Sequence, residues 1–104
     1  ARPYQEDSWR LSTLGDGSLL AVVADGMGGH AGGATASRLA VEAFVHAIEQ
    51  GGGLADGLDD ANAAVGKGAA GKSELAGMGA TLVGVHLRGD ELRFRLEIDG
   101  RIEA

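Results

Sequence analysis

The sequence predicts an α+β fold with mainly antiparallel strand pairing, and three observations carry that prediction. Stretches near both ends of the chain have the short apolar patterns of strands. Between them the apolar period changes to that of amphipathic helices. Short turns join the strands within each end. The predicted order is therefore strand, strand, helix, helix, strand, strand, with a hairpin at each end.

The composition is that of one domain or a piece of one. The chain has 104 residues, 44% of them apolar, and its 19 glycines follow no collagen period. Nine basic and fifteen acidic residues give a net charge of −6, which argues against nucleic-acid binding. The absence of cysteine excludes disulfides and thiolate zinc sites. No apolar run is long enough for a membrane span and no signal peptide is visible, so we expect a cytoplasmic protein without a membrane partner.

The first predicted hairpin joins residues 8–13 to residues 19–24. Trp9 and Leu11 alternate with polar residues, as in a half-buried strand. The second stretch is a continuous apolar run of the kind found in buried strands. An Asp16-Gly17 step between them is typical of a tight turn.

Two helices and two more strands follow. Val41, Phe44, Val45 and Ile48 lie at i, i+3, i+4 and i+7, which predicts an amphipathic helix from about Gly33 to Gln50. Three glycines end it. Apolar residues at helical spacing then predict a second helix from Leu54 to about Val65, a loop over 66–79, and strands over 80–87 and 92–98 joined by a turn.

A glycine-rich loop follows the second predicted strand and presents one carboxylate, Asp25, to a ligand. Either a hard cation on Asp25 or a phosphate against the loop amides could use this arrangement. The first strand's start and the second strand's end lie at the same end of an antiparallel pair. Glu6 and Asp7 should therefore come near Asp25, which favours a divalent cation. Arg2 would then lie close enough to hold an anionic substrate oxygen.

Histidines offer one candidate for proton transfer. His30 lies in the glycine loop, and we weigh a catalytic role for it evenly against a structural one. His46 and His86 lie within a predicted helix and a predicted strand. They are better explained as structural residues.

Two nucleotide-binding patterns also occur, and both lack their structural context. Gly26-x-Gly28-x-x-Ala31 fits a dinucleotide fingerprint, but no βαβ unit surrounds it. Residues 66–73 match the P-loop pattern through Lys72 and Ser73, but a predicted helix precedes them where a strand is required. We interpret both as coincidences and keep a P-loop nucleotide-binding protein as the second alternative function.

Three motifs occur in order along the chain: Arg2-x-x-Gln5-Glu6-Asp7, then Val23-Ala24-Asp25-Gly26-Met27-Gly28-Gly29-His30, then Gly77-Met78-Gly79-Ala80-Thr81. Together they resemble the metal-dependent protein phosphatases, the type 2C Ser/Thr family in a bacterial form. Gln5 stands where the family usually has Asn, and Ala80 where it usually has Thr. The resemblance implies an antiparallel β-sandwich flanked by helices, of which residues 1–104 form the N-terminal part of a single domain.

The resemblance also implies hydrolysis of phosphoserine or phosphothreonine on proteins by a metal-activated water, with two Mg²⁺ or Mn²⁺ ions. Asp25 would bridge both ions, with the Gly26 carbonyl and Glu6 as further ligands to one of them. Asp7 would orient metal-bound waters and Arg2 would bind the substrate phosphate. Some members use a histidine directly after the Asp-Gly step as general acid. Met27 stands there in this chain, which leaves His30 as the candidate.

The chain departs from the family pattern at its C-terminal end. The family's Gly-Asp-Ser strand is missing from residues 96–101, which resemble either a degraded remnant of it or a later hairpin, and the late aspartate ligands are also missing. Half a sandwich would leave apolar faces uncovered, so we expect an inactive chain that either misfolds or pairs with another chain, which can be a second copy of itself. The expected substrate is a phosphorylated protein of a Ser/Thr kinase pathway. The first alternative is a binding or scaffold module that recognises phosphoprotein without turnover.

Overall fold

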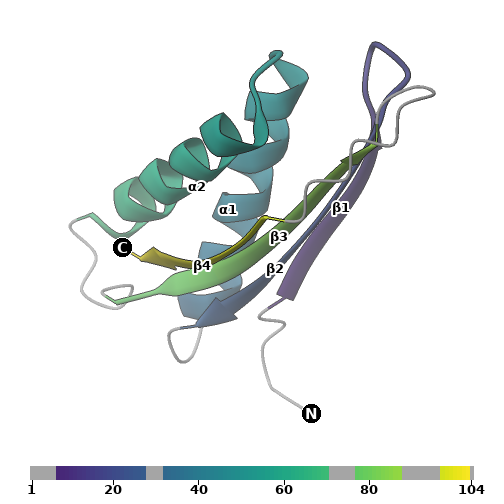
Figure 1. Cartoon of the computed structure of the whole chain (residues 1–104). Coiled ribbons are helices and arrows are strands. Elements are labelled where there is room, and N and C mark those ends of the chain that lie inside the picture. The colour runs from purple at the N-terminus through teal and green to yellow at the C-terminus, as the bar shows by residue number, and fades with distance from the viewer. Residues whose placement is uncertain (1–6, 28–31, 71–76, 88–96, 104) are drawn as a thin grey trace.

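The computed structural model describes residues 7–27, 32–70 and 77–87, together with the backbone of residues 97–103. It places one four-stranded sheet against two helices (Figure 1). The elements are β1 (Asp7–Thr13), β2 (Leu19–Met27), α1 (Gly32–Glu49), α2 (Leu54–Ala69), β3 (Gly79–Leu87) and β4 (Glu97–Glu103). The sheet order is β1-β2-β3-β4, and every neighbouring pair is antiparallel. The predicted α+β fold and the first hairpin are confirmed.

The two faces of the sheet are chemically different. Side chains alternate along a strand, and in β2 the residues Leu20, Val22 and Ala24 are buried whereas Val23 and Asp25 are exposed. β3 follows the same rule, with Ala80 and Leu82 buried and Thr81 exposed. One face therefore belongs to the core and the other is open among the described residues.

Both helices lie on the buried face. α1 contacts β1, β2 and β3, whereas α2 packs against α1 and reaches β4. The predicted apolar stripe of α1 enters the core, since Val41, Phe44, Val45 and Ile48 are all buried. α2 begins after a glycine turn, and the backbone N–H of Gly53 donates to the Asp56 carboxylate at 2.8 Å.

Phe44 fills the space between α1, α2 and the sheet. A Cβ atom added at Gly57 of α2 would lie 2.7 Å from the ring, and one added at Gly84 of β3 would lie 2.6 Å from it. The ring is therefore packed directly against backbone on two sides. Glycine at both positions lets α2 and β3 approach α1 this closely.

The second helix is longer than predicted. It continues to Ala69, so the predicted loop over 66–79 is wrong for residues 66–69. Gly68 lies within that predicted loop, but in the structure it allows close packing: a Cβ there would lie 2.4 Å from Leu39 Cδ1 and 3.4 Å from Met78 Cε. A glycine in a helix can mark a close neighbour as well as a turn.

The last strand also differs from the prediction over 92–98. Residues 92–96 lie outside the described part, and β4 runs from Glu97 through Glu103 without turning at Asp99-Gly100. A hairpin at that step is therefore excluded. Ala80 pairs with Ile102 and Leu82 with Asp99. Two residues of β4, Gly100 and Arg101, thus face the single residue Thr81 in a β-bulge.

Within the part of the chain described here there is one sheet. None of the helices it contains is both long and apolar enough to cross a bilayer.

The packing of Phe44 predicts opposite effects for two Gly→Ala changes in one helix. Gly57→Ala places a methyl group against the ring and should lower the free energy of unfolding by about 1–3 kcal/mol. Gly66→Ala meets nothing within 4 Å and should raise it by up to about 1 kcal/mol through helix propensity. Urea denaturation measures both. Equal effects of the two changes would contradict this account of the core.

Candidate functional site

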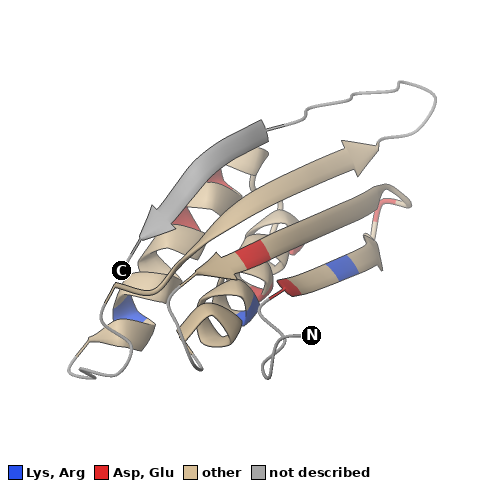
Figure 2. Cartoon of the chain, turned by 90° about the horizontal axis from the view of Figure 1, so that it is seen from below, with Lys and Arg blue, Asp and Glu red and all other residues tan. Residues whose placement is uncertain are grey.

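Two carboxylates face each other across the first hairpin. Asp7 pairs directly with Asp25 in the β1–β2 register, and Asp25 pairs directly with Thr81 on its other side. All three residues are exposed. They form a polar row across three strands, on the face of the sheet away from the helices. The acidic positions of β1 and β2 are red in Figure 2.

The strand pattern explains why the row is accessible. Burial alternates along β2, so Ala24 and Gly26 are buried whereas Asp25, which lies between them, is exposed. Asp7 is the first residue of β1, and the antiparallel pairing brings it to the end of β2. Asp7 and Asp25 are therefore brought together at one end of the sheet, as antiparallel pairing predicted for these two residues, and Gly26 follows Asp25 in the same strand.

The other predicted site residues lie outside the described part of the chain: Arg2, Glu6 and His30. In the described ranges, no group of three or more His, Cys, Asp or Glu side chains is placed to hold a metal ion. What the described part offers is the pair Asp7 and Asp25, and carboxylate oxygens of this kind suit a hard divalent cation. The chemistry of the donor set fits Mg²⁺ or Mn²⁺.

Thr81 and the bulge beside it are features of this row that the sequence analysis did not assign. Thr81 carries a hydroxyl at the row, and the β-bulge of Gly100 and Arg101 lies directly opposite it. Bulges occur preferentially at sheet edges and beside active sites. The sequence did contain a signal for Thr81, because this residue ends the third motif. Side chains alternate along β3, so Thr81 lies on the open face next to the buried Ala80.

The P-loop interpretation is not supported by the structure. Residues 66–69 belong to the C-terminal end of α2. A phosphate-binding loop needs backbone amides ahead of a helix N-terminus, whereas the end of a helix carries partial negative charge. Lys72 and Ser73 lie outside the described residues, as do Gly28 and Ala31 of the dinucleotide pattern.

His86 has the structural role that was expected. Its Nε2 lies 2.9 Å from the Ser18 hydroxyl, and Ser18 in turn donates its backbone N–H to the Asp16 carboxylate at 2.9 Å. The Ser18 hydroxyl bonds to the same carboxylate. These contacts tie the β1–β2 turn to β3, at the end of the sheet opposite Asp25.

Solved structures with the same fold define the class of protein. A crystal structure of the Mycobacterium tuberculosis serine/threonine phosphatase PstP/Ppp matches with a TM-score of 0.71 at 32% identity, covering 86% of this chain and 39% of that one. The PstP catalytic domain in complex with two manganese ions matches with 0.70, at the same identity and coverage. A Stage II Sporulation E family protein from Thermanaerovibrio acidaminovorans matches with 0.67 at 35% identity, covering 77% of this chain and 38% of its own.

The sequence comparison then identifies the family. The profile described as Protein phosphatase 2C matches residues 3–102, and this chain belongs to that family. The curated PstP of M. tuberculosis (strain ATCC 25618 / H37Rv) is 40% identical over 82 residues. That match covers 73% of this chain and 16% of PstP. The chain therefore spans a minor part of the relatives it matches.

The opposed carboxylates predict a stability change that depends on salt. Like charges directly opposite each other in a sheet are destabilising. In the presence of a chelator, Asp25→Asn should raise the free energy of unfolding by about 0.2–1 kcal/mol at low ionic strength. Asp59→Asn, an exposed acid on α2, is the matched control and should change it less. The gain at Asp25 should shrink in 0.5 M salt, as screening requires. A gain that is independent of salt would contradict a charge–charge origin.

Proposed function

We propose that this chain supplies part of the active site of a phosphatase that hydrolyses phosphoserine or phosphothreonine on proteins with two Mg²⁺ or Mn²⁺ ions. The observation that carries the proposal is the direct pairing of Asp7 with Asp25 on the open face of the sheet. Membership of the Protein phosphatase 2C family supports it, because the related PstP binds two manganese ions. Residues 1–104 then form the N-terminal part of a single domain.

Each predicted site residue has a task in this proposal. Asp25, the Gly26 carbonyl and Glu6 would hold the metal ions. Asp7 accepts hydrogen bonds from the water that attacks phosphorus and so orients it. When bound, divalent ions would acidify that water and neutralise charge on the phosphoryl group.

Arg2 and His30 complete the proposed chemistry on the substrate. The Arg2 guanidinium presents a fork of N–H donors that matches two phosphate oxygens. His30 donates a proton to the departing serine or threonine oxygen. The substrate is a phosphoprotein, which a Ser/Thr kinase must supply.

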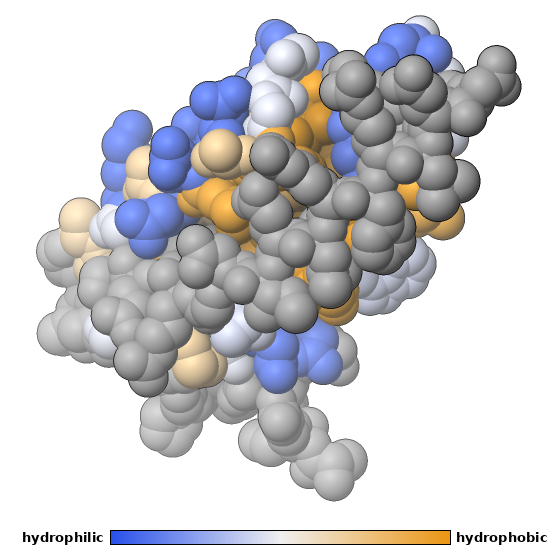
Figure 3. All heavy atoms as spheres, in the orientation of Figure 1, coloured by the Kyte–Doolittle hydropathy of each residue, from blue (hydrophilic) through white to orange (hydrophobic). Residues whose placement is uncertain are grey.

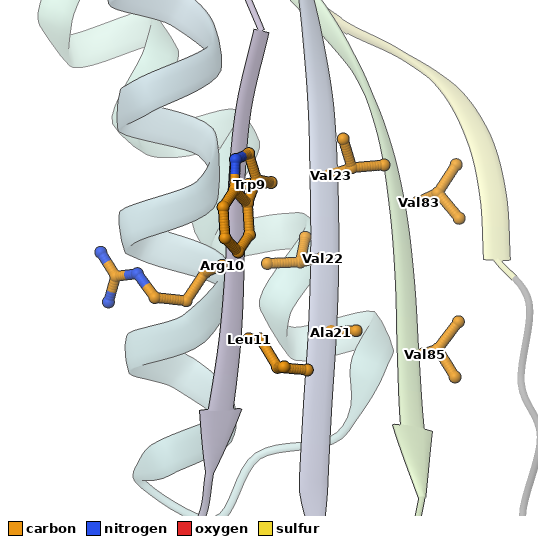
Figure 4. A pocket seen from close by; sticks show the side chains of 8 residues that line it. All are labelled: Trp9, Arg10, Leu11, Ala21, Val22, Val23, Val83 and Val85. Atoms are coloured by element: carbon orange, nitrogen blue, oxygen red, sulfur yellow. The ribbon is translucent and has the colours of Figure 1, made fainter.

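The open face of the sheet carries an exposed apolar surface. Trp9, Leu11 and Val23 are 73%, 59% and 46% exposed. With Ala21, Val83 and Val85 they line a hollow of about 320 Å³ (Figure 4). Hydrophobic residues reach the surface in the view of Figure 3 as well. We propose that the chain alone is inactive and self-associates through this face, which further residues of the domain would otherwise cover.

The proposed chemistry is tested by Mn²⁺ binding and by hydrolysis of a phosphothreonine peptide. Turnover by the chain within its complete domain should require Mn²⁺ and should fall by at least about 100-fold in Asp25→Asn, because a proposed metal ligand would be lost. The isolated chain should bind Mn²⁺ in an Asp25-dependent way without turnover. Asp60→Asn, the same charge change on the exposed side of α2, should leave both unchanged. Phosphopeptide binding without any turnover by the complete domain would favour the binding-module alternative.

The proposed self-association is tested by analytical ultracentrifugation of the isolated chain. Replacing Trp9 with Ser and Leu11 with Thr together should weaken association by at least about 10-fold, since two apolar side chains of the contact are removed. Arg38→Ala changes an exposed residue of α1 on the other side of the molecule and should have no effect. A monomeric wild-type chain at high concentration would contradict self-association.

A further inference from the structure

The strand that carries Asp7 is weakly held. β1 is an edge strand among the described elements, paired only with β2. Five of its seven residues are exposed, and only Ser8 and Ser12 are half-buried on the side of the helices. Edge segments with few buried side chains open readily. The stability of the end of β1 that carries Asp7 therefore depends on its few contacts with the rest of the fold.

A hydrogen bond between two serines supplies such a contact. The Ser8 hydroxyl of β1 lies 3.0 Å from the Ser37 hydroxyl of α1. Ser37 is fully buried, with 0% exposure, and its hydroxyl donates to the Ala34 carbonyl at 3.2 Å. A hydroxyl has only one proton to donate. Ser37 therefore accepts the hydrogen bond that Ser8 donates.

The Ser8–Ser37 hydrogen bond lies next to the pair of carboxylates in the sheet. Ser8 directly follows Asp7, and its partner across the sheet is Ala24, which directly precedes Asp25. Ser8 faces the helices while Asp7 faces the open side, because neighbouring side chains of a strand alternate. Fixing Ser8 against α1 therefore fixes the backbone from which Asp7 projects.

We propose that Ser37 is a positioning residue that holds the first residues of β1, and with them Asp7, in register opposite Asp25. The consequence for metal binding rests on the proposed function, whereas the effect on the strand does not. An alanine at position 37 removes the hydroxyl to which Ser8 donates. The half-exposed Ser8 would turn to water, and the end of the edge strand would open.

The test measures amide hydrogen exchange in the 104-residue chain and in the variants S8A, S37A and S8A/S37A. S37A should speed exchange at the first amides of β1 by about 2- to 10-fold, the range expected for the loss of one hydrogen bond. Exchange in β3 should not change. S12A, the same substitution at the other helix-facing serine of β1, is the matched control and should leave the first amides unaffected.

The double variant shows whether the two single changes act through the Ser8–Ser37 hydrogen bond or independently of each other. If the bond carries the effect, S8A/S37A should match S37A alone, because removing the second partner removes nothing more. Unchanged exchange at the start of β1 in S37A, or additive effects of the two changes, would overturn the proposal. A general rise in exchange that includes β3 would also overturn it, because that result indicates global destabilisation.

Mn²⁺ titration of the same variants tests whether the Ser8–Ser37 hydrogen bond affects the proposed metal site. S37A and S8A should each weaken Mn²⁺ binding by a similar factor of about 2 to 10, and S12A should not. If the unaltered chain bound no Mn²⁺ while S37A still opened β1, the proposed metal site would fail and the positioning role would stand. Unweakened Mn²⁺ binding in a variant with an opened strand would show that Asp7 does not need this support, and would overturn the link to the site.

Discussion

The packing of the Phe44 ring against two glycines sets the geometry of the whole molecule. The ring lies between α1, which carries it, and the backbone of α2 and β3 at Gly57 and Gly84. A single side chain thus lies directly against the backbone of both neighbouring elements, because neither Gly57 nor Gly84 has a side chain of its own to intervene. Because interiors are packed at crystal-like density, such a contact defines one arrangement instead of a family of them.

That arrangement assigns the two faces of the sheet to different tasks. Among the described residues, the large, fully buried side chains lie on the side of the sheet that the helices cover, and they include Phe44, Leu20 and Leu82. The other side has an apolar surface around Trp9 and a polar row at Asp7, Asp25 and Thr81. The candidate site therefore borders the exposed apolar surface. In the proposed function, whatever covers the apolar part therefore also approaches the carboxylates.

Much of this could be predicted from the sequence, where local pattern and topology agree. The first hairpin and α1 follow from apolar periodicity, and antiparallel pairing alone brings Asp7 to Asp25. The prediction failed where a glycine had two explanations. Gly68 falls within a predicted loop, but it lies in α2, where the Leu39 side chain leaves no room for a Cβ atom. Leu39 is distant in sequence, so local pattern could not show this contact. The extent of β4 was missed for a similar reason, because its bulge opposite Thr81 is a property of the pairing with β3. The roles of Arg2, Glu6 and His30 remain predictions.

Ser37 shows why a second group of residues escapes sequence analysis. A serine within the apolar stripe of a helix suggests a tolerated small residue, and only the position of Ser8 gives it a task. Small hydroxyl side chains suit that task, because they let an edge strand lie close to α1 while supplying a directed contact. The strand places Asp7 directly opposite Asp25, so its register decides how the two carboxylates lie. The buried hydroxyl of α1 contacts the residue next to Asp7 and therefore supports this end of the strand from outside the site.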